Sequence, residues 1–479
     1  MRMRQSKTTT ACDGSPAGAY PGAWLSNGVP AAAATGAVSP TRIDPFAPLP
    51  HALLTRLVQL YFEYKFWLAP YPHRPSFERD FARRREQQAG QDEWVALVYG
   101  MATNALMLPA RLLPVSADEA KRLVMVSFEH MMGFLKREYD EYSVDRLYII
   151  ACAANVAQGN GHTALCRELI GSMIFLAVQR NLDRESTYAA LPPLEREMSR
   201  RIWWLVYCAD RAGATCEGAR PVLNEETCAG VALPSTLDDE ALELATAGLE
   251  VPLSADDKAE ARSPSPLWGF FYSAAQWRVA GKIYSRRERD QAIPPEPGTI
   301  LQRIVELDEI IEELDDLLVD VPAFLALKPD AAAVRTPDTP VATSKQGIVV
   351  QQSNIWVTQQ AIRLVAVQYR RELVDLRWSA APPPNAVVPR SDILAVHKLH
   401  ENERAFLASR DLIVGTLLSV LQALPLELVA VNTCPAISMI RFVASTLLTD
   451  HGGDSLSLGH LQQYIDYLSR LESCVYRRI

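Results

Sequence analysis

Three aspartates of one short segment, Asp315, Asp316 and Asp320, are the first residues whose type and spacing could do chemistry. Carboxylates held this close can coordinate magnesium, and magnesium can in turn hold a diphosphate. Residues 307–321, however, carry apolar side chains at three- and four-residue steps, and acidic residues fill the opposite face of the same predicted helix. A second Asp/Asn-rich motif is not evident downstream. The pattern therefore favours an acidic, solvent-facing side of a packed helix over a metal site.

Two histidines, His397 and His400, stand three residues apart in a predicted helix and would share one of its faces. Such a pair could bind zinc. The zincin pattern also needs a glutamate directly after the first histidine, where this sequence has Lys398, and a third ligand, which nothing in the sequence indicates. We therefore interpret both as ordinary histidines of a surface helix. The sequence predicts no catalytic residue, metal or cofactor.

A third group combines arginines with aromatic residues: His73, Arg74, Phe77, Arg201 and Arg220. Together they could line a cleft for an anionic small effector, because arginine recognises carboxylates and phosphates through two parallel hydrogen bonds. The alternative is that these groups tie an irregular segment to a helical body through internal hydrogen bonds and ion pairs. The sequence favours this second, structural interpretation.

Eight cysteines are spread along the chain at positions 12, 152, 166, 208, 216, 228, 434 and 474, and no two form a Cys-x-x-Cys pair. This pattern is typical of buried, reduced thiols in an intracellular protein. The N-terminus lacks the apolar run of a secretion signal. The longest apolar stretch, 412–431, is interrupted by Pro425 and Glu427, which favours a core helix and turn over a membrane span.

The charge balance limits the kinds of partner that the chain can bind. The formal net charge is −8, from 48 basic and 56 acidic residues. This balance argues against a protein that grips a nucleic-acid backbone over a broad surface of its own. The short run Arg83-Arg84-Arg85 is interpreted as a solvated helix face.

The pattern of apolar residues predicts an all-α protein whose ordered part lacks period-two strands. We expect a disordered segment at 1–48, a helical region at 49–328, a flexible loop at 329–346 and further helices at 347–479 that pack on the same body. A second long surface loop with one short helix is expected at 235–266. Helices are expected at 53–70, 77–85, 92–108, 117–138, 143–157, 161–181, 194–212, 268–285, 300–319, 348–375, 391–423, 435–449 and 456–476.

The helix around 194–212 is expected to be central. Its apolar residues recur at helical steps, and Trp203, Trp204 and Tyr207 widen the stripe over most of its circumference. Pro192 and Pro193 precede it, as is common at a helix start. Arg200 and Arg201 are expected to pair with glutamates of the first turns, and Asp210 with Arg211 to cap the far end.

The order of several motifs resembles one family, the middle homology region of fungal zinc-binuclear-cluster transcription factors, also called the fungal-specific transcription factor domain. The resemblance covers roughly residues 50–450. It begins with Tyr61-Phe62 and a Pro-x-x-His-Arg-Pro-Ser-Phe motif and continues through an Arg-Arg-Ile-Trp-Trp element to a Leu-x-x-Leu-Leu-x-x-Val-Pro helix end. Its signature residues are His73, Arg74, Pro75, Phe77, Arg200, Arg201, Trp203, Trp204, Asp210, Arg211, Gly218, Arg220 and Pro221. The sequence departs from the family where Ala219 interrupts the usual Gly-Arg-Pro.

The resemblance implies a nuclear regulator of RNA polymerase II genes, such as a fungal metabolic or secondary-metabolite gene cluster, and not an enzyme. It would also imply six cysteines of a DNA-binding zinc cluster near the N-terminus, but the first 150 residues contain only Cys12. We therefore expect no zinc cluster in this chain and doubt direct DNA contact. DNA binding would come from a cluster-bearing partner or from an upstream exon missing from the gene model.

Two alternatives remain open at this stage. The first is a co-regulator that senses a small metabolite without touching DNA, suggested by the arginine and aromatic residues above. The second is a magnesium-dependent all-α enzyme resembling terpene synthases, suggested by the aspartates at 315–320. No membrane partner is expected.

Overall fold

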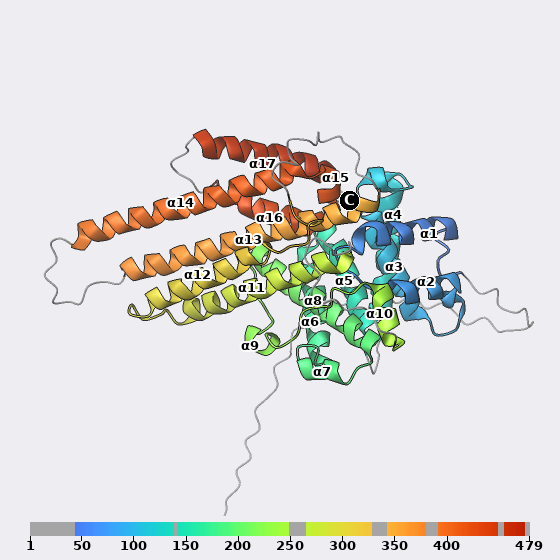
Figure 1. The fold of residues 1–479 in the computed structure, drawn as a ribbon. Helices are drawn as coiled ribbons and strands as arrows, with labels where there is room; N and C mark the ends of the chain where they lie inside the picture. The colour runs from blue at the N-terminus through green and yellow to red at the C-terminus, as the bar shows by residue number, and fades with distance from the viewer. Residues whose placement is uncertain are drawn as a thin grey trace, which may run out of the picture. The chain divides into compact units, whose positions relative to one another are not determined.

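The computed structural model describes residues 44–137, 142–248, 265–327, 343–379, 391–448 and 455–474. Within these ranges the regular secondary structure is helical and contains no β-strand, which confirms the predicted all-α class (Figure 1). The residues from Asp44 onward form one compact unit. The longer helices are α1 (His51–Leu60), α2 (Arg74–Ala82), α3 (Asp92–Leu106), α4 (Ala117–Leu135), α5 (Val144–Gly159), α6 (Thr163–Gln179), α8 (Pro193–Glu217), α10 (Asp239–Thr246), α11 (Pro266–Ala292), α12 (Ile300–Asp316), α13 (Thr343–Ser379), α14 (Ser391–Ala423), α16 (Thr433–Ser445) and α17 (Ser455–Cys474). The short helices are α7 (Glu185–Ala189), α9 (Glu225–Cys228) and α15 (Leu426–Ala430).

The folded body begins earlier than the sequence predicts. Phe46 and Leu49 are buried, and Phe46 packs on Tyr99 of α3 with ring centroids 5.2 Å apart. The disorder predicted for 1–48 is therefore wrong for its last residues, because two apolar side chains there find a place in the core. Residues 1–43 lie outside the described part of the chain.

The sequence predicts one helix from residue 53 to Pro70, but the α-helix α1 ends at Leu60. After α1 the chain forms one π-helical turn, η1 (Tyr61–Lys65), in which Tyr61, Tyr64 and Lys65 are buried. π-Helical turns are rare and are frequent at functional sites. The turn keeps a polar side chain, that of Lys65, on the buried face of the helix.

The segment that contains His73, Arg74 and Pro75 is helical rather than irregular. Helix α2 begins at Arg74, with His73 at its N-cap position and Pro75 in its first turn. Proline is tolerated there because the first amide groups of a helix have no partner within it. Ser76, expected to cap this helix, instead lies inside it and pairs through its hydroxyl with His73 Nδ1 at 2.9 Å.

Helix α8 is the central helix, as the sequence predicts. It packs against α5, α6, α11 and α16. Trp203 and Trp204 are 0% and 1% exposed. The helix is longer than predicted and ends at Glu217, where Gly218 takes up a left-handed conformation with φ of 62°. Glycine adopts this conformation without steric cost, so the predicted motif residue marks the helix end.

The long helices α11, α12, α13 and α14 run side by side, and α11 and α13 contact α8 (Figure 1). The acidic residues of α12 do not simply face solvent as predicted. Asp308 pairs with Arg370 of α13 at 2.8 Å, Asp315 pairs with Arg363, and Glu313 pairs with Lys282 of α11 at 2.6 Å. The apolar residues Leu307, Ile310 and Leu314 are buried. The aspartates therefore serve as half-exposed partners of neighbouring arginines.

Within the described residues, one segment, Asn402–Ala423 of α14, is long and apolar enough to cross a membrane by length and composition alone. Helices in the core of a soluble fold can meet the same criterion. This segment belongs to a helix that packs against α13 and α17, and the chain turns at Pro425, the N-cap of α15. The contacts agree with the predicted packed helix and turn.

Candidate functional site

Arg201 occupies the centre of a buried polar network. Its side chain is 0% exposed and donates to Asp239 Oδ1 at 2.6 Å, to Glu197 Oε1 at 3.2 Å and to the Pro70 carbonyl at 3.3 Å. Burial raises the pKa of Glu197, although the nearby Arg201 guanidinium opposes this. The pair with Glu197 lies within α8, as predicted, but the stronger partner, Asp239, lies beyond the next loop.

Asp239 connects this network to the start of α2. His73 Nε2 lies 3.1 Å from the Asp239 carbonyl oxygen, and the Arg74 amide donates to Asp239 Oδ2 at 2.8 Å. A carboxylate at a helix start satisfies an amide that has no partner inside the helix. One aspartate therefore joins α2, α8 and α10. Asp239 is not among the residues predicted from the sequence, because it lies in a segment with the composition of an acidic surface loop.

Arg200 and Trp204 fix the loop on the other side of α8. Arg200 binds both carboxylate oxygens of Glu185, at 2.8 and 3.0 Å, and donates to the Ala232 carbonyl at 3.1 Å. Trp204 Nε1 donates to the same Ala232 carbonyl at 2.8 Å. The expected pairing of Arg200 with a glutamate of its own helix is wrong, since Glu185 of α7 takes that place.

Asp210 and Arg211 hold the segment that follows α8 rather than cap the helix. Asp210 accepts hydrogen bonds from the Val222 and Leu223 amides at 2.9 and 3.1 Å. Arg211 donates to the Leu223 carbonyl and to Glu225, both at 3.0 Å. These bonds fold the Gly218–Pro221 turn back along the last turns of the helix.

The predicted effector cleft does not assemble from its five residues. His73 and Arg201 are buried and hydrogen-bonded to Asp239, whereas the Arg220 side chain is 81% exposed and pairs with Glu288 at 3.1 Å. Phe77 packs against Phe62 and Trp94. Arg74 and Phe77 share a hollow of about 380 Å³, which is the part of the predicted cleft that the structure forms.

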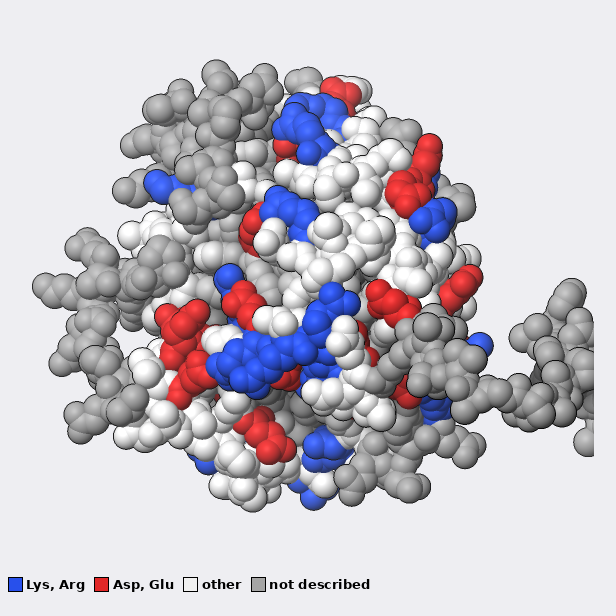
Figure 2. Space-filling model, turned by 90° about the vertical axis from the view of Figure 1, so that its right-hand side faces the viewer, with Lys and Arg blue, Asp and Glu red and all other residues white. Residues whose placement is uncertain are grey.

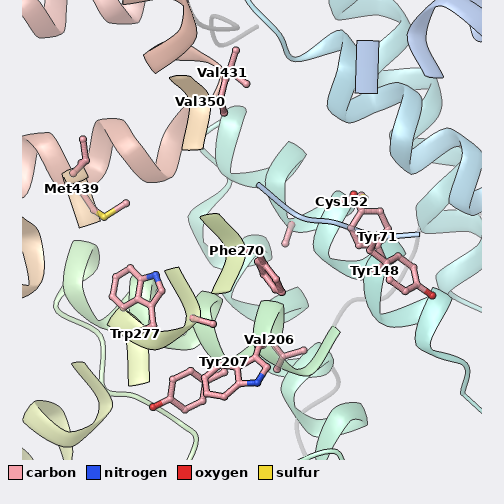
Figure 3. Packing of buried hydrophobic residues seen from close by; sticks show 14 of the residues in the cluster. Tyr71, Tyr148, Cys152, Val206, Tyr207, Phe270, Trp277, Val350, Val431 and Met439 are labelled. Atoms are coloured by element: carbon pink, nitrogen blue, oxygen red, sulfur yellow. The ribbon is translucent and has the colours of Figure 1, made fainter. Parts of the chain in front are cut away.

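A larger cavity lies in the middle of the helical body, with a volume of about 460 Å³. Its walls come mainly from α5, α6, α8, α11 and α16, and η1, α3 and α13 also contribute residues. Several of the wall residues enter one core in Figure 3. Its size is that of a cavity for a small organic ligand. Small residues of α8 leave this space open, and the apolar wall includes Cys152, Ile170, Ile174, Ala209, Ala212, Gly213, Phe270, Trp277 and Met439.

Lys65 is the cationic group of this cavity that is buried. Its side chain lines the cavity, is 8% exposed as a residue and donates to the Val431 carbonyl at 2.6 Å. Burial lowers the pKa of Lys65 to about 7. In the described part of the chain Lys65 has no carboxylate partner, in contrast to Arg201 and Arg211. The sequence contains a signal for this burial, because Val58, Tyr61 and Lys65 follow one another at helical steps on one face.

Amide side chains line the same cavity. Asn432 Nδ2 lies within reach of the Val350 and Val429 carbonyls and of Ser353 Oγ, at 3.3 to 3.4 Å, but its Oδ1 is buried without a hydrogen-bond partner. Asn104 donates to Cys152 Sγ at 3.0 Å. A buried acceptor without a donor costs free energy unless a ligand or water supplies one.

The described cysteines do not fit a zinc cluster. They are reduced and are distributed over six helices, and no group of three or more metal-binding side chains gathers among the described residues. Four of the thiols line the cavity, those of Cys152, Cys166, Cys208 and Cys216. Burial raises the pKa of Cys166 to about 11, those of Cys152 and Cys216 to about 12, and that of Cys208 well above its ordinary value. These thiols therefore stay protonated at neutral pH and act as apolar wall groups.

Asp315 and Asp316 do not line the cavity. Asp315 pairs with Arg363, as described above, and Asp316 ends α12. The side chains of His397 and His400 lie outside the described residues.

The surface charge is mixed rather than uniformly basic. Figure 2 shows one face on which Lys and Arg side chains form a short band bordered by Asp and Glu. In the run predicted as a solvated helix face, Arg84 pairs with Glu86 at 2.6 Å and Arg85 with Asp80 at 2.9 Å. Arginines neutralised in this way contribute little to a phosphate-binding surface.

Part of the chain matches the model of a known protein family. Residues 58–245 match the family model described as the fungal specific transcription factor domain. No curated protein and no solved structure matches the chain. The matched range contains α2, α8 and all but the last residue of α10, and so all partners of the Arg201 network. Residues 58–245 therefore belong to the fungal specific transcription factor domain, a family of transcription regulators and not of enzymes.

Proposed function

We propose that this protein regulates RNA polymerase II genes in the nucleus through its helical body, with DNA binding supplied from elsewhere. The observation that carries the proposal is the family match at 58–245, over the region in which the signature residues lock α2, α8 and α10 together. The chain contributes no cysteine cluster for zinc, and its net charge of −8 disfavours autonomous binding to a phosphate backbone.

DNA contact then comes from a partner that carries a zinc cluster or from a segment encoded upstream of this sequence. The genes it controls are proposed to form a metabolic or secondary-metabolite cluster, as is common for the family. The position of the signature residues supports the proposal that DNA is bound by another segment or protein. Most of these residues connect helices of the body and do not form a surface for contacting bases.

Purified protein tests this proposal directly. In a gel-shift assay with promoter fragments, the chain alone should give no sequence-specific retardation. Affinity purification from its native cells should recover a factor that bears a zinc cluster, and deletion should change transcript levels of a set of adjacent genes. Tight, sequence-specific binding by the isolated chain, or unchanged transcripts after deletion, would refute the proposal.

The cavity favours a second candidate, a co-regulator whose activity depends on a small metabolite. A space of about 460 Å³ lined mainly by apolar groups, with a few buried polar ones, is the usual form of a ligand site. This candidate differs from the first in the origin of its signal. If transcript levels change with the concentration of a metabolite while the abundance of the partner stays constant, the second candidate is supported. If they change only with the abundance of the partner, the first is supported.

A further inference from the structure

The polar groups of the central cavity are unequally buried, and this difference indicates how a ligand would lie in it. Lys65, Asn104 and Asn432 are buried, with 8%, 7% and 6% of their surface exposed. Arg167 and Arg220 at other parts of the wall are exposed and pair with Glu217 and Glu288. These two exposed arginines therefore each have a carboxylate partner, whereas Lys65 is the buried cation without one among the described residues.

We propose that this cavity binds a mainly apolar small molecule with one carboxylate, and that the carboxylate pairs with Lys65. An ammonium group has three N–H donors, and one of them is used by the Val431 carbonyl. A ligand carboxylate would provide the missing countercharge. A hydrogen bond between two ionised groups in a water-poor site is stronger than one between neutral groups.

The walls decide the character of the rest of the ligand. Between the helices the cavity is bordered by Ile170, Ile174, Phe270, Trp277 and Met439, and by thiols that stay protonated. These surfaces fit a hydrocarbon or ring system rather than a sugar or a nucleotide. The unpartnered Asn432 Oδ1 provides one further acceptor for a donor group of the ligand or for a water that enters with it.

Gly213 shows where the space can be closed. A Cβ atom built on this α8 residue meets nothing within 4 Å, and the residue lines the cavity. A leucine at this position would therefore extend into the cavity without a clash at its Cβ. Leucine also favours the helix over glycine, so the substitution fills the site while supporting the fold.

The inference deepens the proposed function, because occupancy of the cavity would be the regulatory signal. Its test needs only the purified full chain, so its failure is distinguishable from failure of the transcriptional proposal, which is tested with DNA and in cells. The probes are decanoic acid and 1-decanol, which share a ten-carbon body and differ in the carboxylate. Both are titrated below their aggregation limits by isothermal titration calorimetry at pH 6.5.

Wild-type protein should bind decanoate about tenfold more tightly than 1-decanol, the ratio expected for a single charge-assisted contact. Lys65→Met should abolish this preference while retaining 1-decanol binding, and Gly213→Leu should weaken both probes by about tenfold or more. Lys65→Gln keeps a donor for the Val431 carbonyl and serves if the methionine variant does not fold. Equal affinities in the wild type, an unchanged preference in the Lys65 variants, or no binding of either probe would overturn the proposal.

Discussion

Arg201 and Asp239 are separated by 38 residues, yet they form a 2.6 Å ion pair in which both side chains are almost completely buried. The same aspartate accepts from the Arg74 amide at 2.8 Å. A buried charge is tolerated only when a partner and further hydrogen bonds replace its water. The signature arginine of α8 thus acts as a structural junction between three helices, and this relationship generates the first prediction.

Removing one member of this pair should destabilise the whole body. Arg201→Met is expected to lower the free energy of unfolding by about 3–5 kcal/mol, because it leaves the Asp239 carboxylate buried and without its cation. Urea denaturation followed by circular dichroism measures the change. Arg220→Met is the matched control at an exposed arginine and should change the value by no more than about 0.5 kcal/mol. Equal effects of the two substitutions would contradict the central role of Arg201.

The tryptophans of α8 should contribute by burial as well as by hydrogen bonding. Trp204→Ala is expected to cost about 3–5 kcal/mol, because it leaves a cavity in the centre of the body. Trp204→Phe should cost much less, since the ring volume is largely kept and the Ala232 carbonyl still accepts from Arg200. Guanidinium denaturation of the two variants separates these contributions. An unchanged guanidinium midpoint for Trp204→Ala would be incompatible with the 1% exposure of Trp204.

Lys65 should make stability depend on pH in a defined direction. Its pKa is about 7 in the folded protein and about 10.5 in the unfolded chain, so the unfolded chain binds more protons between these values. The unfavourable contribution of Lys65 is therefore complete below pH 7 and fades as the pH rises towards 10. The thiol of Cys434 is the titratable group whose charge opposes the shift.

Lys65→Met consequently should be more stable than the wild type at pH 6, and the difference should shrink between pH 7 and pH 10. Denaturation curves of both proteins at several pH values give the difference directly, and other titrating groups cancel in the comparison. A difference that stays constant over this range would show that Lys65 does not titrate in it.

Two helical glycines should respond to alanine in opposite ways. At Gly281 of α11 a Cβ would collide with the Tyr207 hydroxyl and the Glu225 carboxylate, which are hydrogen-bonded to each other at 2.5 Å. Gly281→Ala should therefore cost about 1–3 kcal/mol. Gly213→Ala meets open space and should gain up to about 1 kcal/mol from helix propensity. Thermal unfolding of both variants checks the sign of each change.

Local patterns were sufficient to predict the helices and the family. The apolar residues around Trp203 and Trp204 recur at helical steps. Such a pattern can be recognised within one segment of the sequence, and it predicts which face of the helix is buried. The same local reasoning ended this helix at residue 212, whereas α8 runs to Glu217 and is followed by the left-handed Gly218. At Arg74 it failed, because a proline in the sequence fits the first turn of a helix as well as an irregular connection.

The partners of the charged residues and the cavity were decided only by the tertiary structure. Asp239 lies 166 residues from His73, and no spacing rule connects them. The cavity exists because α8 presents small residues such as Gly213 to helices that cannot approach closely enough to fill the space. Lys65 follows the apolar stripe of its own helix, so its burial could be read locally, but its lack of a carboxylate partner depends on every helix packed around it. Periodicity is a property of one segment, whereas ion pairing and empty volume are properties of the assembled body.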